Sequence, residues 1–346
     1  MATVDPIPVR KGEVAEEGRD VYDITLIGAG PVGLFGAFYA GLREMRTKVI
    51  EALPEPGGQL AVLYPEKYIY DVPGFPRILA KDLVRHLVEQ ATAFNPTMCY
   101  GERVVDLKRE DDGLLRLTTE TATHWSRTVV ICAGVGAFSP NKMDNPTVAR
   151  LEGKGVYYFV KDKRPFRHKR VLVVGGGDSA VDWALGLKDW ASEVTLIHRR
   201  DGFRAHEASV TELMRSPVQV KLFYELKELH GNHWVQEAVI YHNKTLEEMC
   251  LPVDAVLLSL GFRADLGPIV NWGLHIDKRA IVVNGRFETN IPGVYAAGDI
   301  ASPADSVSLN LIATGFGQVC IAVNCAKNYI DPKSRIFPGH SSEKRL

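Results

Sequence analysis

The hydrophobic pattern in the N-terminal part of the chain begins with a short strand, a glycine turn and a helix. Residues 24–27 (ITLI) form an apolar run that predicts a strand, and the turn GAGPVG follows at residues 28–33. The next segment (LFGAFYAGL) has the apolar face of a helix. A second apolar strand over residues 48–50 ends in Glu51. This order predicts an α/β unit in which a glycine-rich turn connects the first strand to the first helix.

The same order of strand, glycine turn and helix occurs again in the middle of the chain. Residues 171–174 form an apolar run, GGGDSA follows at residues 175–180, and a predicted helix extends through Leu187. The next predicted strand, residues 194–197, ends in a basic segment instead of an acidic residue. That segment contains His198, Arg199, Arg200 and Arg204. The chain thus holds two copies of one pattern, which differ in the charge after the second strand.

The spacing of apolar residues predicts further elements. Apolar residues at helical spacing predict one helix over residues 80–93 and another over residues 311–326. Between residues 218 and 256, strand-like runs alternate with polar turns. Short strands are predicted at residues 104–107, 114–118 and 129–133. A polar segment with two prolines, residues 139–146, separates these strands from the second glycine turn.

Length and composition are typical of a globular protein with about two domains. The 346 residues are 46% hydrophobic and 24% charged, and a net charge of −1 gives no field that would attract nucleic acid. Residues 1–20 are interpreted as a flexible N-terminal arm, and no apolar run approaches the roughly 18 residues of a membrane span. The five cysteines are scattered without a CxxC, so we predict five small buried hydrophobic side chains and no metal site. We expect a cytoplasmic protein.

Each glycine of the first turn has a physical task in binding a dinucleotide. Gly28 allows the tight turn, Gly30 lets backbone N–H groups approach a pyrophosphate, and Gly33 lets the helix pack against the strand. The pyrophosphate then lies at the helix N-terminus, where unpaired N–H groups favour an anion. Glu51 lies 18 residues beyond Gly33, and its carboxylate can accept hydrogen bonds from ribose hydroxyls.

The second turn has the features of an NADP site. A carboxylate at the end of the following strand would favour the free 2′-hydroxyl of NAD, whereas a guanidinium favours the 2′-phosphate of NADP. The basic segment lies where that ribose is expected. We therefore predict that residues of the turn and of the basic segment bind NADP(H). They are Gly175, Gly177, Asp178, Ser179, Ala180, His198, Arg199, Arg200 and Arg204.

A flavin signature lies near the other end of the chain. Thr289, Tyr295 and the sequence AAGD at residues 296–299 look like the second FAD motif, whose final Asp reaches the ribityl or pyrophosphate part of the cofactor. The loop at residues 54–60 (PEPGGQL) can place its backbone and a Gln amide against a planar ligand. The two flavin signals bracket the second glycine turn. The NADP-binding domain is therefore predicted to be inserted into the FAD-binding domain.

These motifs resemble those of the two-dinucleotide-domain flavoproteins and, specifically, the thioredoxin-reductase family. GGGDSA followed by HRRDGFRAH is similar to that family's NADPH site. Thioredoxin reductases carry a CxxC just upstream of the second turn, whereas residues 155–170 here contain no cysteine. The branch that fits is the thioredoxin-reductase-like ferredoxin–NADP reductases. The matching segments are GAGPVG, GGQLAVLYPEKYIYDVPGFP, GGGDSAVDW, SLGFRADLGP and FPGHSS (337–342).

The resemblance implies an α/β fold with two Rossmann-like dinucleotide-binding domains of the three-layer ββα type. The FAD-binding domain is expected to comprise residues 21–137 and 264–330, with the NADP-binding domain, residues 138–263, inserted between them. A C-terminal tail, residues 331–346, is expected to lie over the flavin. Because relatives form homodimers, a homodimer is expected.

The resemblance also implies a set of FAD contacts. Tyr64 is expected to stack on one face of the flavin and His340 on the other. Val32 departs from the family pattern, since relatives often have Thr there, and a side-chain hydroxyl contact is lost. The expected FAD contacts are Gly28, Gly30, Val32, Gly33, Glu51, Gly58, Gln59, Tyr64, Val104, Phe138, Asp299 and Ser341.

The implied activity is electron transfer between NADPH and ferredoxin or flavodoxin, by hydride transfer to FAD N5 and single-electron transfer to the carrier. No side chain is required as an obligatory acid or base. The candidate docking residues for an acidic carrier are Lys161, Lys163, Arg164 and Arg167. Two alternatives stay open: an NADPH oxidase or quinone reductase on the same scaffold, and a flavin-bearing sensor or binding module without turnover.

Overall fold

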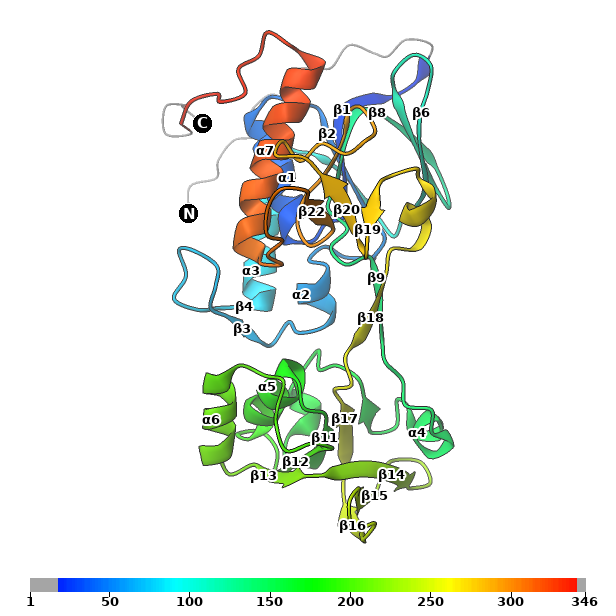
Figure 1. Cartoon of the computed structure of the whole chain (residues 1–346), viewed down its shortest axis with the longest axis vertical. Helices are drawn as coiled ribbons and strands as arrows, with labels where there is room; N and C mark the ends of the chain where they lie inside the picture. The colour runs from blue at the N-terminus through cyan, green and yellow to red at the C-terminus, as the bar shows by residue number, and fades with distance from the viewer. Residues whose placement is uncertain (1–17, 341–346) are drawn as a thin grey trace. The chain divides into compact units, whose positions relative to one another are not determined.

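The computed structural model, drawn in Figure 1, consists of two compact units. The structure describes residues 18–340, except for the side chains of residues 137–139 and 264. Unit 1 comprises the residues up to Val62, Tyr68–Ala137 and those from Ala264 onward. Unit 2 comprises Phe138–Arg263 and a short segment, Leu63–Lys67. The hydrophobic pattern does not indicate that Leu63–Lys67 belongs with the second unit.

Unit 1 is built on a seven-stranded sheet in which parallel and antiparallel pairs meet. The order is β5-β2-β1-β8-β7-β6, and β21 pairs with β8. β1 is parallel to β2 and β8, whereas β6, β7 and β8 form an antiparallel meander. The strands are β1 (Val21–Ile27), β2 (Thr47–Glu51), β5 (Thr97–Tyr100), β6 (Val104–Arg109), β7 (Leu115–Thr119), β8 (Thr123–Ile131) and β21 (Val294–Ala296).

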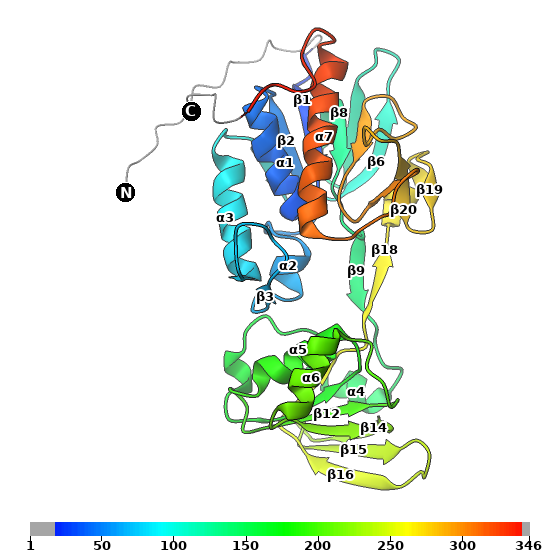
Figure 2. The same ribbon diagram turned by 60° about the vertical axis from the view of Figure 1, so that its left-hand side comes forward.

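Three helices of unit 1 lie on one side of this sheet, as Figures 1 and 2 show. They are α1 (Pro31–Leu42), α3 (Ala80–Thr92) and α7 (Ile312–Ile330), and α1 contacts both of the others. A methyl group at Gly36 of α1 would lie 2.5 Å from Leu26 of β1 and 2.6 Å from Val319 of α7. The missing side chain therefore lets α1 pack tightly against strand and helix at once.

Unit 2 contains a five-stranded parallel sheet in the order β10-β17-β11-β12-β13. An antiparallel three-stranded sheet, β14-β15-β16, covers one face, and α5 packs against the other. The strands are β10 (Val156–Tyr157), β11 (Arg170–Val174), β12 (Glu193–His198), β13 (Gln219–Leu222), β14 (Tyr224–His230), β15 (Glu237–His242), β16 (Glu248–Pro252) and β17 (Ala255–Leu258). The helices are α4 (Pro146–Leu151), α5 (Asp178–Leu187) and α6 (Glu207–Arg215).

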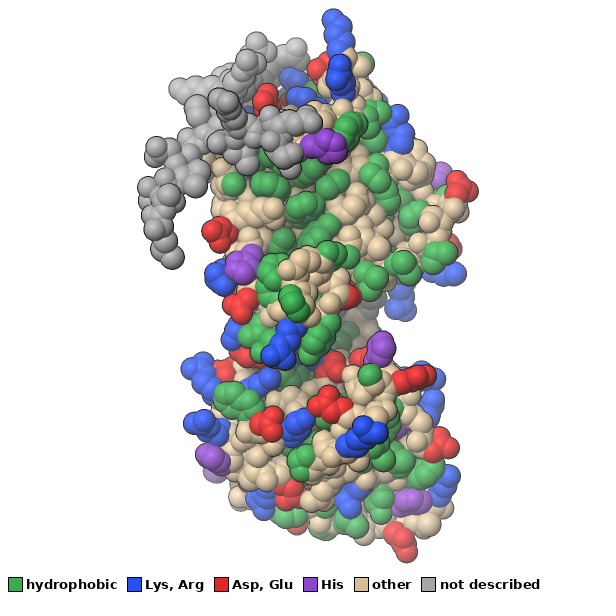
Figure 3. All heavy atoms as spheres, turned by 90° about the vertical axis from the view of Figure 1, so that its left-hand side faces the viewer, with side chains coloured by type: hydrophobic (Ala, Val, Ile, Leu, Met, Phe, Trp, Pro, Cys, Tyr) green, Lys and Arg blue, Asp and Glu red, His purple; other side chains and the backbone are tan. Residues whose placement is uncertain are grey.

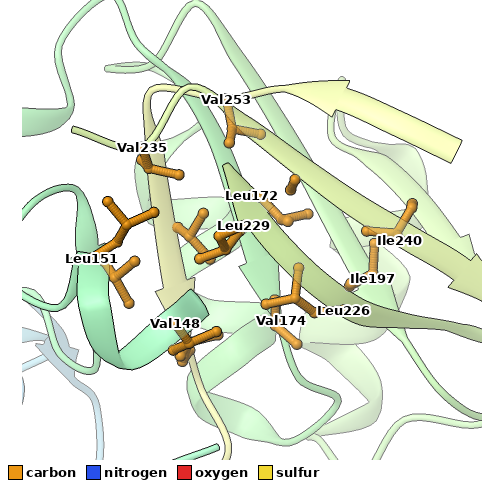
Figure 4. Close-up of a cluster of buried hydrophobic side chains, with 14 of the residues drawn as sticks. Val148, Leu151, Leu172, Val174, Ile197, Leu226, Leu229, Val235, Ile240 and Val253 are labelled. Atoms are coloured by element: carbon orange, nitrogen blue, oxygen red, sulfur yellow. The ribbon is translucent and has the colours of Figure 1, made fainter. Parts of the chain in front are cut away.

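The core of unit 2 is divided by its parallel sheet into two layers. On β11, Leu172 and Val174 face the layer toward the three-stranded sheet, which Figure 4 shows, while Val171 and Val173 face the helical layer. Residues alternate across a strand, so a strand covered on both faces must be apolar throughout. This is why residues 171–174 form one unbroken hydrophobic run.

The remaining elements connect these layers. β9 and β18 pair with each other, at the boundaries where the chain passes from one unit to the other. The other short elements are α2 (Gln59–Val62), β3 (Tyr68–Ile69), β4 (Ile78–Leu79), β9 (Ala137–Pro140), η2 (Arg164–Phe166), β18 (Phe262–Asp265), η3 (Gly267–Asn271), β19 (Ile276–Asp277), β20 (Ala280–Val283) and β22 (Ala301–Pro303). None of the described helices is long and apolar enough to cross a membrane.

Two expectations need correction. The prediction that all five cysteines are buried is wrong: Cys132 and Cys325 are buried, but Cys250 is exposed and the other two are half-buried. Cys250 lies on β16, an outer strand whose side chains are mostly exposed. The last helix extends to Ile330, beyond the predicted end at residue 326. The polar residues of its final turn hid this extension from the apolar pattern.

A partly buried polar cluster lies within unit 1. Lys48 Nζ of β2 is 2.9 Å from His124 Nδ1 of β8, and His124 Nε2 is 2.9 Å from a carboxylate oxygen of Glu102. Burial lowers the pKa of Lys48. The ligand atoms of Cys99, Glu102 and His124 lie within 4.8 Å of one another, an arrangement that could hold a metal ion. Both ring nitrogens of His124 are already engaged, so this arrangement leaves no ring nitrogen for a cation.

Arg170, at the start of β11, and Asp254, just before β17, form an ion pair. This pair predicts that the stability of the fold depends on pH. Asp254 accepts hydrogen bonds from the Arg170 backbone N–H and guanidinium at 2.8–3.0 Å, and these bonds lower the pKa of the carboxyl group. A lowered pKa stabilises the fold above the ordinary value of 3.8, and that contribution is lost as pH falls through the folded-state pKa. We expect Asp254→Asn to cost about 1 kcal/mol at pH 7, a modest value because both side chains are over a third exposed.

Urea unfolding between pH 7 and pH 3 measures this effect. The difference between wild type and Asp254→Asn should shrink toward the acid end of the series. Asp144→Asn, at an exposed position of the same unit, serves as the control and should stay within about 0.5 kcal/mol of wild type. A cost for Asp254→Asn that does not change with pH would contradict the assignment.

Candidate functional site

The first glycine turn, between β1 and α1, brings three backbone segments into close contact. Gly28 has φ +106°, and its N–H donates to the Ile50 carbonyl at 2.8 Å. A methyl group at Gly28 would lie 2.5 Å from the Cys132 carbonyl oxygen, and one at Gly33 would overlap the carbonyl oxygen of Gly28. A methyl group at Gly30, by contrast, would have no described atom within 4 Å. The turn is therefore closed on its inner side and open at Gly30.

The N-terminus of α1 has the features of an anion-binding site. Gly30 is its N-cap residue and makes no side-chain hydrogen bond, and the first turn has no acidic residue. The first N–H groups of a helix need partners from outside the helix. An open approach at Gly30, together with these N–H groups, fits the pyrophosphate of a dinucleotide.

Glu51 ends β2 beside this turn and is buried. Its carboxylate accepts the Ala29 N–H at 2.6 Å and the Leu53 N–H at 2.8 Å. Burial raises the pKa of Glu51, and these two hydrogen bonds oppose the shift. A carboxylate has about four lone-pair sites, so two backbone donors leave it able to accept from ribose hydroxyls. The structure thus fixes Glu51 against the glycine turn.

Gln59 and Asp299 also meet near the first turn. The Gln59 side chain donates to Asp299, and this bond opposes the rise that burial causes in the pKa of Asp299. The Gly57 N–H donates to the Ala29 carbonyl at 2.8 Å, and a methyl at Gly58 would lie 3.2 Å from the Gly30 Cα. The loop before α2 therefore lies directly beside the glycine turn.

Two residues of this region act through packing or positioning. The Val32 side chain lies against Gly298 and Gly315, because methyl groups there would be 3.2 Å and 2.5 Å from its Cγ2. An apolar residue at 32 thus joins α1 to the turn after β21 and to α7. Gln318 of α7 accepts the Gly298 N–H at 2.7 Å and so holds the residue before Asp299. Sequence reasoning missed Gln318, although a Gln within an apolar helix was the available signal.

The remaining expected FAD contacts have different surroundings. Val104 is buried in β6. Tyr64 belongs to the short segment grouped with unit 2, and its ring packs against a hydrophobic cluster of that unit. His340 is exposed and lies edge-on to Phe337, with ring centres 5.4 Å apart. Ser341 lies outside the described residues, as does the side chain of residue 138.

The second glycine turn, between β11 and α5, is closed in the same way. Gly175 has φ +154°, and a methyl there would overlap the Ser259 carbonyl oxygen at the end of β17. A methyl at Gly176 would overlap the His198 ring. Burial lowers the pKa of His198.

Ser259 Oγ is buried and has no hydrogen-bond partner among the described residues. A free hydroxyl beside the turn, at the carboxyl end of a parallel strand, fits a site that a polar ligand completes.

The basic segment folds back onto this turn. Arg204 N–H donates to the Gly176 carbonyl at 2.7 Å, and His206 N–H donates to the Asp178 carboxylate at 2.9 Å. The His198 ring stacks on Phe203 with ring centres 5.3 Å apart. The structure therefore brings the turn, Asp178 and the predicted arginines together. The side chains of Arg199, Arg200 and Arg204 are exposed.

Comparison with known proteins identifies the family of this chain. A family model described as pyridine nucleotide-disulphide oxidoreductase matches residues 22–324. Two proteins named ferredoxin–NADP reductase, from Symbiobacterium thermophilum and Geobacillus thermodenitrificans, are 58% and 53% identical over 94% of this chain and 98% of theirs. The chain belongs to this family, in its ferredoxin–NADP reductase branch.

Solved structures give the same fold. The thioredoxin reductase of Lactococcus lactis is 26% identical, with a TM-score of 0.75, over 89% of this chain and 99% of that one. The thioredoxin reductase of T. acidophilum is 25% identical, with a TM-score of 0.76, over 91% and 99%. The predicted α/β fold with two Rossmann-like domains is thereby confirmed.

The first glycine turn leads to a test with three alanine variants. Gly33→Ala should destabilise the protein by about 3 kcal/mol or more, because the methyl overlaps backbone that cannot move aside. Gly30→Ala should keep the fold, since φ −70° suits alanine, but should weaken FAD binding at least about tenfold by filling the open approach. Gly317→Ala, at an exposed helical position, is the control and should gain up to about 1 kcal/mol.

Thermal unfolding of the apoprotein and fluorescence titration with FAD separate these effects. FAD binding by Gly30→Ala at wild-type strength would contradict a pyrophosphate at this turn.

Proposed function

We propose that this protein is a flavoprotein oxidoreductase that transfers electrons between NADPH and ferredoxin or flavodoxin. One observation carries the proposal most directly: the chain has two closed glycine turns of the dinucleotide-binding kind, and only the second is followed by a basic segment. Residues 155–170 lack the cysteine pair that a thioredoxin-type dithiol reaction needs. Relatives over 50% identical are named ferredoxin–NADP reductase.

FAD and NADP(H) are the cofactors, and this chain supplies their placement. When bound, FAD accepts a hydride and passes electrons on singly, chemistry that belongs to the cofactor itself. We assign FAD to unit 1, where the N-terminus of α1 holds the pyrophosphate and Glu51 the ribose. The Asp299–Gln59 pair holds the ribityl chain. No side chain is required to donate or remove a proton.

NADPH is assigned to unit 2. The N-terminus of α5 and the Gly175–Gly177 turn hold its pyrophosphate. Arg199, Arg200 and Arg204 hold the 2′-phosphate by charge-assisted hydrogen bonds. The lowered pKa of His198 favours its neutral form, which suits a stacking or packing role beside the turn and adds no positive charge.

Further features are proposed from the family resemblance. Tyr64 and His340 are placed on the two faces of the flavin, and residues 331–346 form a tail over it. We also propose a homodimer and a cytoplasmic location.

The proposed carrier-docking surface is the basic stretch at Lys161, Lys163, Arg164 and Arg167. The Arg164 side chain is 83% exposed and pairs with Asp162. The Arg167 guanidinium lies 5.8 Å from the Trp190 ring centre. On the face drawn in Figure 3, basic and acidic side chains are interspersed, so no single-sign field covers that face. Docking is proposed to depend on this local stretch.

Coenzyme choice tests the arginines. Charge-assisted hydrogen bonds contribute about 1.5–3 kcal/mol, so Arg199→Ala should raise the KM for NADPH roughly 10- to 200-fold and change the KM for NADH far less. Steady-state reduction of a small acceptor with each coenzyme measures this directly. Equal effects on both coenzymes would show that Arg199 does not contact the 2′-phosphate.

Charge reversal tests the docking surface. Replacing Lys163 and Arg164 by Glu should reduce the rate with ferredoxin at low salt by about tenfold or more, because steering by charge is lost. Reduction of a small neutral acceptor should be unchanged. The double replacement of Arg150 and Lys154 by Glu, at exposed positions of the same unit, is the matched control. If both double variants slow ferredoxin reduction alike, the stretch at 161–167 is not the docking site.

A further inference from the structure

Asn243 connects the turn between β15 and β16 to the start of the basic segment. It lies directly after β15 (Glu237–His242), and its side-chain Nδ2 donates to the Arg199 carbonyl at 2.8 Å and to Glu225 Oε1 at 3.0 Å. Both partners are acceptors, so the amide nitrogen and not the oxygen must face them. The two hydrogens of one amide group are thus used in a fork that leaves no alternative orientation.

The backbone of Asn243 is fixed as well. Its N–H donates at 2.7 Å to the carbonyl of Phe223, the residue between β13 and β14. Phe223 has φ +65°, a left-handed conformation that is an outlier for a bulky side chain. The Lys244 ammonium lies 3.6 Å from the Phe223 ring centre. A strained corner held by neighbouring contacts is a feature that functional positions often show.

The far end of the basic segment is held by different residues. Arg204 and His206 donate backbone N–H bonds to the Gly176 carbonyl and to the Asp178 carboxylate. The segment is therefore tied to the glycine turn at its end and to Asn243 at its beginning. The Arg199 side chain between these anchors is exposed. Its backbone is fixed while its guanidinium is left accessible to a ligand.

We propose that Asn243 is a positioning residue for recognition of the 2′-phosphate of NADPH. By holding the Arg199 carbonyl, it limits the positions from which the guanidinium can reach the phosphate. Fixing the backbone before binding lowers the ordering cost of binding, which the long arginine side chain makes large. The inference rests on the proposed NADPH site and adds a residue that acts through Arg199.

A charge-neutral double variant isolates the bond to Arg199. Asn243→Asp alone removes both donors and sets a carboxylate against Glu225. Combined with Glu225→Gln, the site keeps its wild-type charge, and the new Gln can donate to the new Asp. The Arg199 carbonyl then loses its donor and faces a carboxylate oxygen, which also accepts only. Glu225→Gln alone keeps the bond to Arg199, and Asn145→Asp removes a similar amide-to-carbonyl bond, to Lys227 at 2.7 Å, as the matched control.

The double variant should raise the KM for NADPH about three- to tenfold, the loss expected for one hydrogen bond. Its KM for NADH and its kcat should stay within about twofold of wild type. Inhibition by adenosine 2′,5′-bisphosphate should weaken, whereas inhibition by adenosine 5′-phosphate should not. Glu225→Gln and Asn145→Asp should keep the wild-type preference for NADPH.

Two results would overturn the proposal. An unchanged KM for NADPH in the double variant would show that Arg199 needs no such anchor. Equal weakening of NADPH and NADH, or of the two adenosine inhibitors, would assign Asn243 a general structural role. A wild-type enzyme without preference for NADPH would instead refute the proposed coenzyme site. The wild-type comparison therefore separates the two failures.

Discussion

The structure depends on two places where backbone meets backbone without room for a side chain. At the first, Gly33 of α1 packs on the carbonyl of Gly28; at the second, Gly175 packs on the carbonyl of Ser259. The first contact brings the N-terminus of α1 over the end of β1, and the second brings the turn before α5 against the end of β17. At the first turn, the unpaired N–H groups of α1 then face the open side at Gly30. The absence of a side chain at these glycines thus determines how closely the backbone segments pack.

The two turns differ mainly in the segments that they hold in place. The two glycine turns are similar, and they differ in the residues at the end of the second strand: a buried carboxylate at Glu51 of β2, and exposed guanidinium groups after β12. Glu51 bonds back to its own turn at Ala29. The basic segment bonds to its turn through Arg204. In each case the residue proposed to recognise the ribose and the turn proposed to bind phosphate form one connected unit, which would fix the distance between the ribose and pyrophosphate contacts.

Much of this could be predicted from the sequence because the relevant contacts are local. A strand, a glycine turn and a helix are neighbours in the chain, and strands buried on both faces form unbroken apolar runs. The sequence could not indicate the contacts that join distant segments. Asn243 meets Arg199 across 44 residues, and Gln318 meets Gly298 across 20. Each is a single polar residue with no periodicity to mark it. The exposure of Cys250 likewise results from the position of β16 at the edge of its layer, which the strand pattern alone does not give.

The pairing of β9 with β18 has a consequence for how such a protein can arise and be altered. The chain leaves unit 1 at Ala137 and returns at Ala264, and these residues belong to two strands that are hydrogen-bonded to each other. To unit 1, the long stretch between them is therefore equivalent to a closed surface loop, and the entropic cost of a loop grows only slowly with its length. A domain with adjacent ends can be gained or exchanged as a single genetic insertion without disturbing the host fold. The two-stranded junction is thus a natural splice point for recombining nucleotide-binding modules.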